Sequence, residues 1–198
     1  MRTADALAAL HADVERHRRI ALDGWRALPE EVVLRRPAPR SWSAVECLEH
    51  VRRANDMYLG HMERATAGAE RRRRLPVEEY RPGALGRRIA AALAPAPAPA
   101  DAPPRIRFKG PTLGSYDPRR DAAPVPADEA FDRYAAQLDR ILGLLERFER
   151  VDLHTRSNTL LGPLLRLRLG DMMSYLVAHT DRHLAQGQRA IDRALAGA

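Results

Sequence analysis

The sequence predicts an all-α protein, a four-helix bundle with a long Pro-rich insertion between its second and third helices. Four stretches of the chain repeat apolar residues at intervals of three and four, which is typical of helices that bury one face. No stretch reads as a convincing strand, so the apolar helix faces have only one another to pack against. The 198 residues fit one domain, 1–198, with a substantial core.

The first helix is expected from Ala4 to Leu28, where Pro29 ends it because proline lacks the backbone N–H that a helix needs. Its apolar face comprises Leu7, Leu10, Val14, Ala21, Trp25 and Leu28. A loop with the sequence PEEVVLRRPAPRSW then leads to Ser43.

The second helix is expected to start at Ala44. Ser43 followed three residues later by Glu46 is the capping-box pattern, in which each side chain takes the backbone N–H of the other residue. Gly68 is the predicted end of this helix. Its apolar face comprises Val45, Leu48, Val51, Asn55, Tyr58, Leu59 and Met62.

Residues 71–125 break the helical pattern. They contain PAPAPADAPP and, further on, KGPTLGSYDP. Alternating Ala-Pro favours extended polyproline geometry without helical hydrogen bonds. A short helix fits around Gly83 to Leu93. Two interpretations of the insertion stay open: a functional lid over one end of the bundle, or a loosely held excursion of the chain.

The third helix is expected from Ala127 to about Arg150, and the last helix from about Leu169 to Leu195. The segment VDLHTRSNTLLGPLLRLRLG reads as the connection between them. The apolar face of the last helix comprises Leu169, Met172, Met173, Leu176, Thr180, His183, Leu184 and Ile191.

The net charge of +7 comes from 33 basic and 26 acidic side chains, and Lys109 is the only lysine. Nucleic-acid-binding proteins concentrate basic charge on one patch and add stacking aromatic residues. Here the arginines are scattered among acidic residues. The one dense cluster, Arg71 to Arg74, has no aromatic interleaving and lies at a helix end, where cations complement the helix dipole. We therefore expect no nucleic-acid partner.

Cys47 is the only cysteine, so the chain forms no internal disulfide and needs no oxidising compartment. Asp5 and Asp13 interrupt the N-terminal stretch where a secretory signal would be apolar. No run approaches the roughly 20 apolar residues of a membrane-spanning helix. The expected location is the cytoplasm, without a membrane partner.

The stretch YLVAHTDRHL places His179 and His183 four residues apart, on one face of the last helix. The same spacing occurs in the HExxH motif of zinc proteases, but Thr180 takes the place of its glutamate. By itself HxxxH is a weak signal. Burial strengthens it, because a buried imidazole needs a hydrogen bond or a metal ion.

His50 is the third ligand that the sequence offers, because it lies on the flank of the second helix's apolar face. A surface histidine beside Arg52 and Arg53 fits the pattern equally well.

Two further residues fit near such a site. His17 continues the apolar spacing of the first helix. We interpret it first as a core histidine with a hydrogen-bond partner, and second as a residue that supports the ligands from behind or replaces one of them. Cys47, one turn before His50, fits the same pocket, although a small buried hydrophobe is the commoner role of a free cysteine. Surface or loop positions are expected for His11, His61 and His154.

Two stretches resemble DinB-like proteins. In LRRPAPRSWSAVECLEHV, a proline-containing loop leads to Trp42-Ser43 and then to His50, seven residues after the serine. The segment LLGPLLRLRLGDMMSYLVAHTDRHLAQ is similar to that superfamily's last helix, which ends in HxxxH, here His179 and His183. The resemblance leaves residues 71–125 largely unmatched.

The resemblance implies a four-helix bundle, often a homodimer, in which His50, His179 and His183 hold one divalent metal ion. We expect zinc or nickel, although copper and iron also accept imidazole ligands. The superfamily includes S-transferases and isomerases that use mycothiol, bacillithiol or glutathione. The expected partners are therefore a low-molecular-weight thiol and an electrophilic small molecule.

Three neutral ligands with open positions are typical of a catalytic rather than a structural metal site. A metal-dependent hydrolase is the nearest alternative. A non-catalytic metal- or ligand-binding stress-response protein is a second one, because no residue is a convincing general base: Glu46, Asp171 and Asp181 each have a capping or surface role that explains them.

Overall fold

The computed structural model describes residues 1–93, 116–121, 123–159 and 162–197. This part of the chain is mostly helical and contains one two-stranded sheet. Its α-helices and strands are α1 (Thr3–Arg18), α2 (Glu30–Leu34), α3 (Ala44–Arg71), α4 (Ala84–Leu93), α5 (Ala127–Phe148), β1 (Arg156–Thr159), β2 (Gly162–Arg168) and α6 (Leu169–Ala196).

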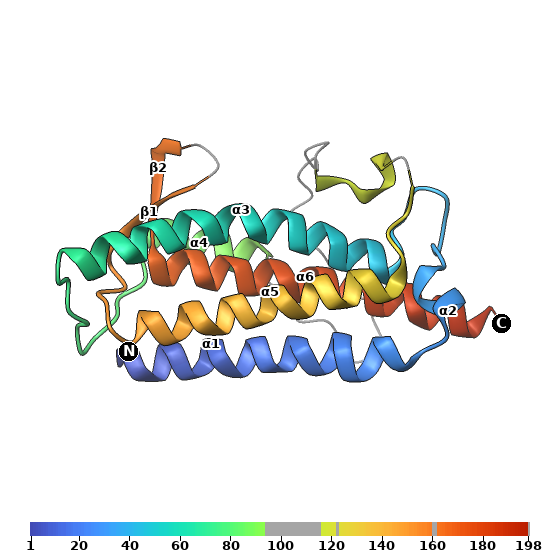
Figure 1. The fold of residues 1–198 in the computed structure, drawn as a ribbon, viewed down its shortest axis with the longest axis horizontal. Coiled ribbons are helices and arrows are strands. Elements are labelled where there is room, and N and C mark those ends of the chain that lie inside the picture. The colour runs from blue at the N-terminus through green and yellow to red at the C-terminus, as the bar shows by residue number, and fades with distance from the viewer. Residues whose placement is uncertain (94–115, 122, 160–161, 198) are drawn as a thin grey trace.

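Four long helices, α1, α3, α5 and α6, lie side by side (Figure 1). Helices α1 and α3 each pack against both α5 and α6. Figure 1 shows that α1 and α6 run in one direction and that α3 and α5 run in the other. Because α3 and α5 are parallel, the chain between them has to travel the length of the molecule.

The core lies between these four helices. It combines aliphatic side chains with a few large aromatic ones, and truncation of such a buried side chain costs about 2–5 kcal/mol. The largest fully buried side chains include Trp25, Tyr134, Phe131, Phe148, Leu48, Leu59 and Met62.

The first helix is only partly as predicted. Helix α1 ends at Arg18, and the chain continues as the π-helical turn η1 (Arg19–Gly24) and the 3-10 turn η2 (Trp25–Ala27). The change coincides with a close approach at Trp25, because a Cβ on Gly187 of α6 would lie 2.3 Å from the indole. The indole Nε1 also donates a hydrogen bond to Gln188 Oε1 at 2.8 Å. Between Pro29 and Ser43, part of the predicted loop is helix α2.

The start of α3 is as predicted. Ser43 Oγ accepts from the Glu46 N–H and the Glu46 carboxylate accepts from the Ser43 N–H, so both halves of the capping box are present. The helix ends at Arg71 rather than at Gly68. Two residues later, the backbone of Arg73 has a φ of 51°, which is the left-handed conformation that commonly follows the end of a helix.

The predicted short helix in the insertion is confirmed as α4, which packs on α6. The buried carboxylate of Asp171 on α6 holds the chain just before α4: it accepts a hydrogen bond from Tyr80 Oη at 2.6 Å and from Gly83 N at 3.0 Å. The segment PAPAPADAPP, on which the two interpretations of the insertion depend, lies outside the described residues.

The expectation that the chain contains no strand is wrong. Strands β1 and β2 pair antiparallel, with Arg156 opposite Arg168 and Ser157 opposite Leu167. The alternation of Leu and Arg in LLRLRL is the period-two pattern of a strand. Its side chains divide accordingly, since Leu167 is buried whereas Arg166 is exposed.

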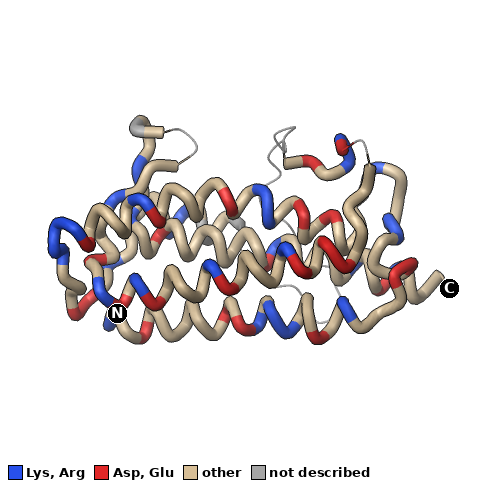
Figure 2. Tube along the Cα trace, viewed as in Figure 1, with Lys and Arg blue, Asp and Glu red and all other residues tan. Residues whose placement is uncertain are grey.

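Charges of both signs alternate along the helices (Figure 2). Many arginines pair with a carboxylate of a neighbouring helix, such as Arg140 with Glu63 and Arg147 with Glu70. None of the described helices combines the length and the hydropathy that a membrane span requires.

Candidate metal centre

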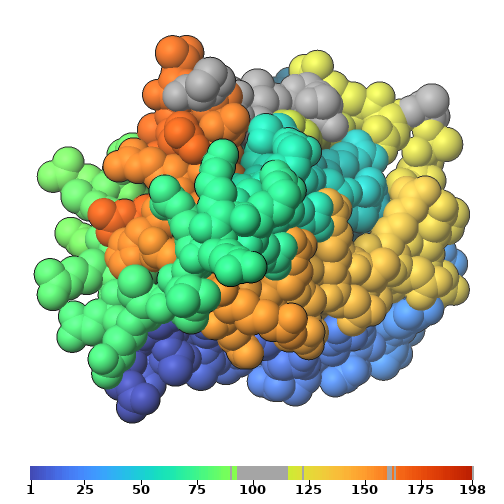
Figure 3. Space-filling model, turned by 60° about the vertical axis from the view of Figure 1, so that its left-hand side comes forward, coloured from blue at the N-terminus to red at the C-terminus, as the bar shows by residue number. Residues whose placement is uncertain are grey.

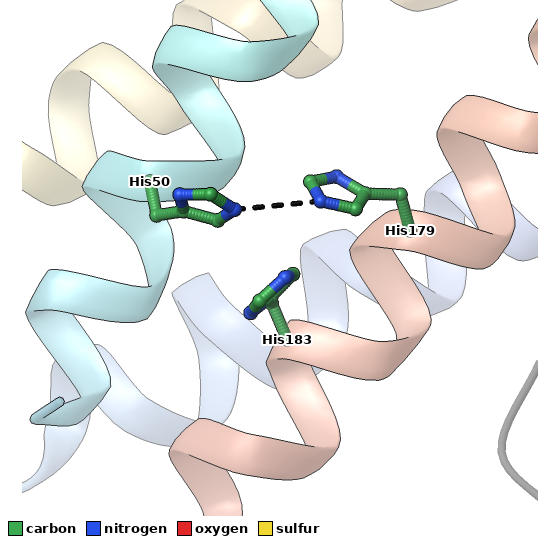
Figure 4. A group of neighbouring side chains, drawn as sticks. All are labelled: His50, His179 and His183. Atoms are coloured by element: carbon green, nitrogen blue, oxygen red, sulfur yellow. Dashed lines mark hydrogen bonds between the residues drawn. The ribbon is translucent and has the colours of Figure 1, made fainter. Parts of the chain in front are cut away.

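Three histidines from two helices meet at one place. His50 of α3 and His179 and His183 of α6 point toward one another across the gap between the helices (Figure 4). One nitrogen of each ring lies within 4.8 Å of one nitrogen of each other ring. His50 Nε2 and His179 Nε2 are 3.4 Å apart.

Helix geometry explains this convergence. His179 and His183 are one turn apart and share a face of α6, with their ring centroids 4.6 Å apart. Helix α3 runs alongside, and the His50 ring lies 4.4 Å from the His183 ring and 5.3 Å from the His179 ring. The structure therefore brings together the three histidines that the sequence singled out.

Burial keeps the three imidazoles neutral. The exposed fractions are 6% for His50, 9% for His179 and 7% for His183. Loss of solvation lowers the pKa of His50, lowers the pKa of His179 to about 3 and places the pKa of His183 well below 6.5. The neighbouring histidines and Arg182 lower the last two pKa values further. Neutral imidazole is the form that binds metal ions.

The orientation of the His50 ring is fixed from outside the cluster. Its Nδ1 lies 2.8 Å from the backbone carbonyl oxygen of Tyr116. A carbonyl only accepts, so Nδ1 carries the proton and donates, and the lone pair is on Nε2, which faces His179.

The donor set fits a divalent ion. Two nitrogens bound tetrahedrally at about 2.0–2.1 Å from zinc are about 3.3 Å apart, close to the 3.4 Å between His50 Nε2 and His179 Nε2. The Nδ1 atoms of His179 and His183 are buried without a hydrogen-bond partner among the described residues. Buried polar atoms are normally paired. Because His179 faces His50 through its Nε2, an ion in the cluster accounts for at most one of these two atoms, His183 Nδ1.

The family model of the DinB superfamily matches residues 13–186, which include all three histidines. The chain belongs to the DinB superfamily. No curated protein and no solved structure matches the chain significantly. Members of this superfamily are often metal-dependent, and this chain contains a cluster of three histidines.

One side of the cluster is closed by the loop before α3 and by the short helix η4 (Pro118–Arg120). The Trp42 ring lies 4.5 Å from the His50 ring, and its Nε1 donates to Asp117 Oδ1 at 3.2 Å. Arg119 donates to Asp117 Oδ2 at 2.6 Å, and this interaction lowers the pKa of Asp117 to about 2. Tyr116 and Asp117 were missed by sequence reasoning, because they lie in the insertion that resembles no known motif.

On α6 the cluster is flanked by Tyr175 and Arg182. The Tyr175 ring is stacked on His179, with 8° between the ring planes, and its hydroxyl accepts a hydrogen bond from Tyr58 Oη at 3.4 Å. Within the described structure Arg182 pairs with no carboxylate, and its buried Nε has no hydrogen-bond partner. Its positive charge acts on all three imidazoles. The spacing of α6 places both residues, but no motif singled them out.

His17 lies outside the cluster and is a satisfied core histidine. It is 1% exposed, and its Nε2 hydrogen-bonds to Asp181 Oδ1 at 2.7 Å. Cys47 is buried too and does not belong to the described ligand group. Burial, with a smaller effect of Glu46, raises the pKa of its thiol, which is therefore protonated at neutral pH.

The three carboxylates that are close to the histidines in sequence have other partners. Glu46 caps α3, Asp171 binds Tyr80 and Gly83, and Asp181 binds His17 and Arg16. None of them belongs to the described group of neighbouring ligands. His11, His61 and His154 are likewise outside this group and are partly buried.

Proposed function

We propose that this DinB-superfamily protein is a divalent-metal-dependent S-transferase that joins a low-molecular-weight thiol, of the mycothiol or bacillithiol type, to an electrophilic small molecule. The observation that carries the proposal is the cluster of three buried, neutral imidazoles without a carboxylate among them. We also assign the fold to the four-helix bundles, with residues 71–125 as an insertion, and propose a homodimer, which light scattering would test.

His50, His179 and His183 would hold the ion, and zinc and nickel suit three imidazole nitrogens best. The ion would lower the pKa of a thiol or water that binds to it, so that the nucleophile is anionic at neutral pH. Tyr116 and Trp42 would help His50 to bind the ion, because they fix the orientation of the His50 ring.

Arg182 would bind an anionic substituent of the thiol cosubstrate. Low-molecular-weight thiols of this type carry anionic or polar substituents, and a partly buried guanidinium without a carboxylate partner favours an anionic one. In our proposal Arg182 orients the cosubstrate so that its sulfur lies toward the imidazoles.

The thiol reaction suits the site better than hydrolysis does. Hydrolases that activate water generally use a carboxylate or histidine as a general base or acid. Among the described residues, the group of neighbouring ligands contains no carboxylate. A thiol that has lost its proton needs no further base to attack an electrophile, so the missing carboxylate is no obstacle to transfer.

The test begins with metal content per chain, measured by elemental analysis of tag-free protein. We expect near-stoichiometric metal in the native protein and its loss in His183→Ala. The matched control is His61→Ala, which removes a partly buried histidine of α3 outside the cluster and should leave metal content unchanged. Equal metal content in all three proteins would overturn the site.

The second step is an alkylation assay of the metal-loaded protein with several low-molecular-weight thiols and a chromogenic electrophile. We expect turnover that disappears in His183→Ala. Metal retention without turnover of any thiol or hydrolysis substrate would instead favour the non-catalytic metal-binding or stress-response function. Hydrolysis of esters or amides without thiol transfer would favour the hydrolase.

A further inference from the structure

A second pocket lies toward the other end of α3, about 16 Å or more along the helix axis from His50. Its volume is about 510 Å³, and it is formed by the last turns of α3 and by the segment that leads into β1 and β2. Figure 3 shows these two parts next to one another, α3 in green and the hairpin in orange.

The pocket lining is strongly basic. Six arginines line it and no acidic residue does. They are Arg64, Arg71, Arg72, Arg74, Arg156 and Arg166. Figure 2 shows the basic run at the end of α3. A pocket with a single sign of charge concentrates counter-ions of the opposite sign.

Ion pairing distinguishes these six arginines from the arginines of the neighbouring α5. Within the described structure none of them pairs with a carboxylate, whereas Arg140 and Arg147, on the neighbouring α5, do. The nearby acidic groups are already engaged, Glu70 with Arg147 and Asp152 with His154. The protein therefore compensates the positive charge in the pocket only in part, through the attraction of Arg64 and Arg71 to Glu63 and Glu70.

The helix dipole accounts for only part of this arrangement. Cations at the end of α3 complement its dipole, which explains Arg71 and Arg72. It does not explain why the hairpin adds Arg156 and Arg166. Nor does the dipole explain why the Arg71 and Arg72 side chains both lie near Gly68, where an added Cβ would lie 3.9 Å from Arg72 Nη1 and 4.0 Å from Arg71 Nη2. Two guanidinium groups on the same side of a helix repel one another, and an anion between them would reduce that repulsion.

The pocket wall also contains a buried hydroxyl, that of Thr155. Thr155 lines the pocket and is 8% exposed, and its Oγ1 is buried without a hydrogen-bond partner among the described residues. An unpaired buried hydroxyl is costly and uncommon. A phosphate oxygen would supply its missing acceptor once a bound ligand displaces the side chains that cover this hydroxyl.

We propose that this pocket binds a small molecule that carries two or more phosphate groups. Arginine suits phosphate because its planar fork donates two parallel hydrogen bonds. The volume is within the range of small-molecule sites, about 300–1,000 Å³. Single-stranded nucleic acid fits less well, because the pocket is lined by no Phe, Tyr or Trp on which bases would stack.

Calorimetric titration with inorganic pyrophosphate at low ionic strength tests the proposal. We expect binding by the native protein and a loss of affinity of about tenfold or more in Arg72→Gln/Arg156→Gln. The control is Arg88→Gln/Arg193→Gln, which removes the same charge at exposed positions outside the pocket and should keep native affinity. Equal losses in both double variants, or no binding by the native protein, would overturn the proposal.

Two further variants separate specific binding from other causes. Thr155→Val should weaken pyrophosphate binding while leaving the thermal stability of the ligand-free protein undiminished, since it removes only an unpaired hydroxyl. His183→Ala should bind pyrophosphate as the native protein does, and a loss there would mean that the anion binds at the metal instead. If a single-stranded oligonucleotide binds more tightly than pyrophosphate, in a way that depends on its length and on Arg72 and Arg156, the ligand of the pocket is nucleic acid and the proposal of a small molecule is wrong.

Discussion

His17 of α1 and Asp181 of α6 are joined by a 2.7 Å hydrogen bond. Asp181 lies midway between His179 and His183 in sequence, and two residues correspond to about 200° around a helix, so it faces away from them. Helix α6 therefore carries the histidine cluster on one side and is tied to α1 on the other. The attachment to α1 therefore does not involve the face of α6 that bears His179 and His183.

Replacement of His17 by leucine separates its core role from a ligand role. We expect His17→Leu to lower the free energy of unfolding by about 1–3 kcal/mol, because it leaves a mostly buried Asp181 with one partner fewer. Metal content per chain should stay at the native value. Denaturant unfolding and elemental analysis measure the two effects, and loss of metal would show that His17 is a ligand after all.

The lowered pKa values of the cluster predict how the metal-free protein responds to acid. The unfolded chain takes up protons on these histidines below their usual pKa of 6.5, whereas folded His179 stays neutral down to about 3. The unfolded state then binds more protons, so stability is highest above pH 6.5 and falls as the pH decreases below it.

Comparison with His179→Phe isolates this effect. Between pH 6.5 and about pH 5 the native protein should lose up to about 1.4 kcal/mol per pH unit more than the variant does. Chelator-treated samples and urea unfolding at each pH give the two curves. Parallel curves would mean that His179 titrates normally in the folded protein.

Arg182 is expected to recognise the charge of the thiol and not the metal. Arg182→Gln should raise KM for an anionic thiol by about tenfold or more, because a charge-assisted hydrogen bond is lost. It should leave metal content unchanged. An uncharged thiol with the same enzyme is the control, and its KM should not move. An equal rise in KM for both thiols would argue against our proposal for this residue.

The sequence predicted those features of the fold and of the site that are determined by residues close together in the chain. The Ser43 and Glu46 capping box is decided by four adjacent residues, so the start of α3 was predicted correctly. The position of His179 and His183 on one face of α6 follows from helical periodicity. The β1–β2 hairpin was missed because its alternation of Leu and Arg is short and directly precedes a helix.

Contacts between distant segments were beyond sequence reasoning. The hydrogen bond from His50 to the Tyr116 carbonyl involves a backbone atom, which leaves no residue-type signature. Whether Arg182 has a carboxylate partner depends on how the neighbouring helices pack, which the sequence does not show. The change of helix type after Arg18 coincides with the packing of Trp25 against Gly187, which is far away in the sequence.

The two glycines Gly187 and Gly143 allow a matched test of that packing. An added Cβ on Gly187 would lie 2.3 Å from Trp25, whereas one on Gly143 of α5 would meet nothing within 4 Å. We expect Gly187→Ala to destabilise the protein by about 1–3 kcal/mol through overpacking. Gly143→Ala should stabilise it by about 0.5–1 kcal/mol, because alanine favours a helix. Thermal unfolding compares them, and equal shifts would contradict the close approach.

The proposed metal site joins residues that are far apart in the sequence, since His50 and His179 are separated by 129 positions. During synthesis, α3 leaves the ribosome long before α6, so a growing chain carries one of the three imidazoles for most of its existence. A truncated product that ends before α6 has no cluster at all. Loading with metal would therefore report that α6 has been made and has packed against α3.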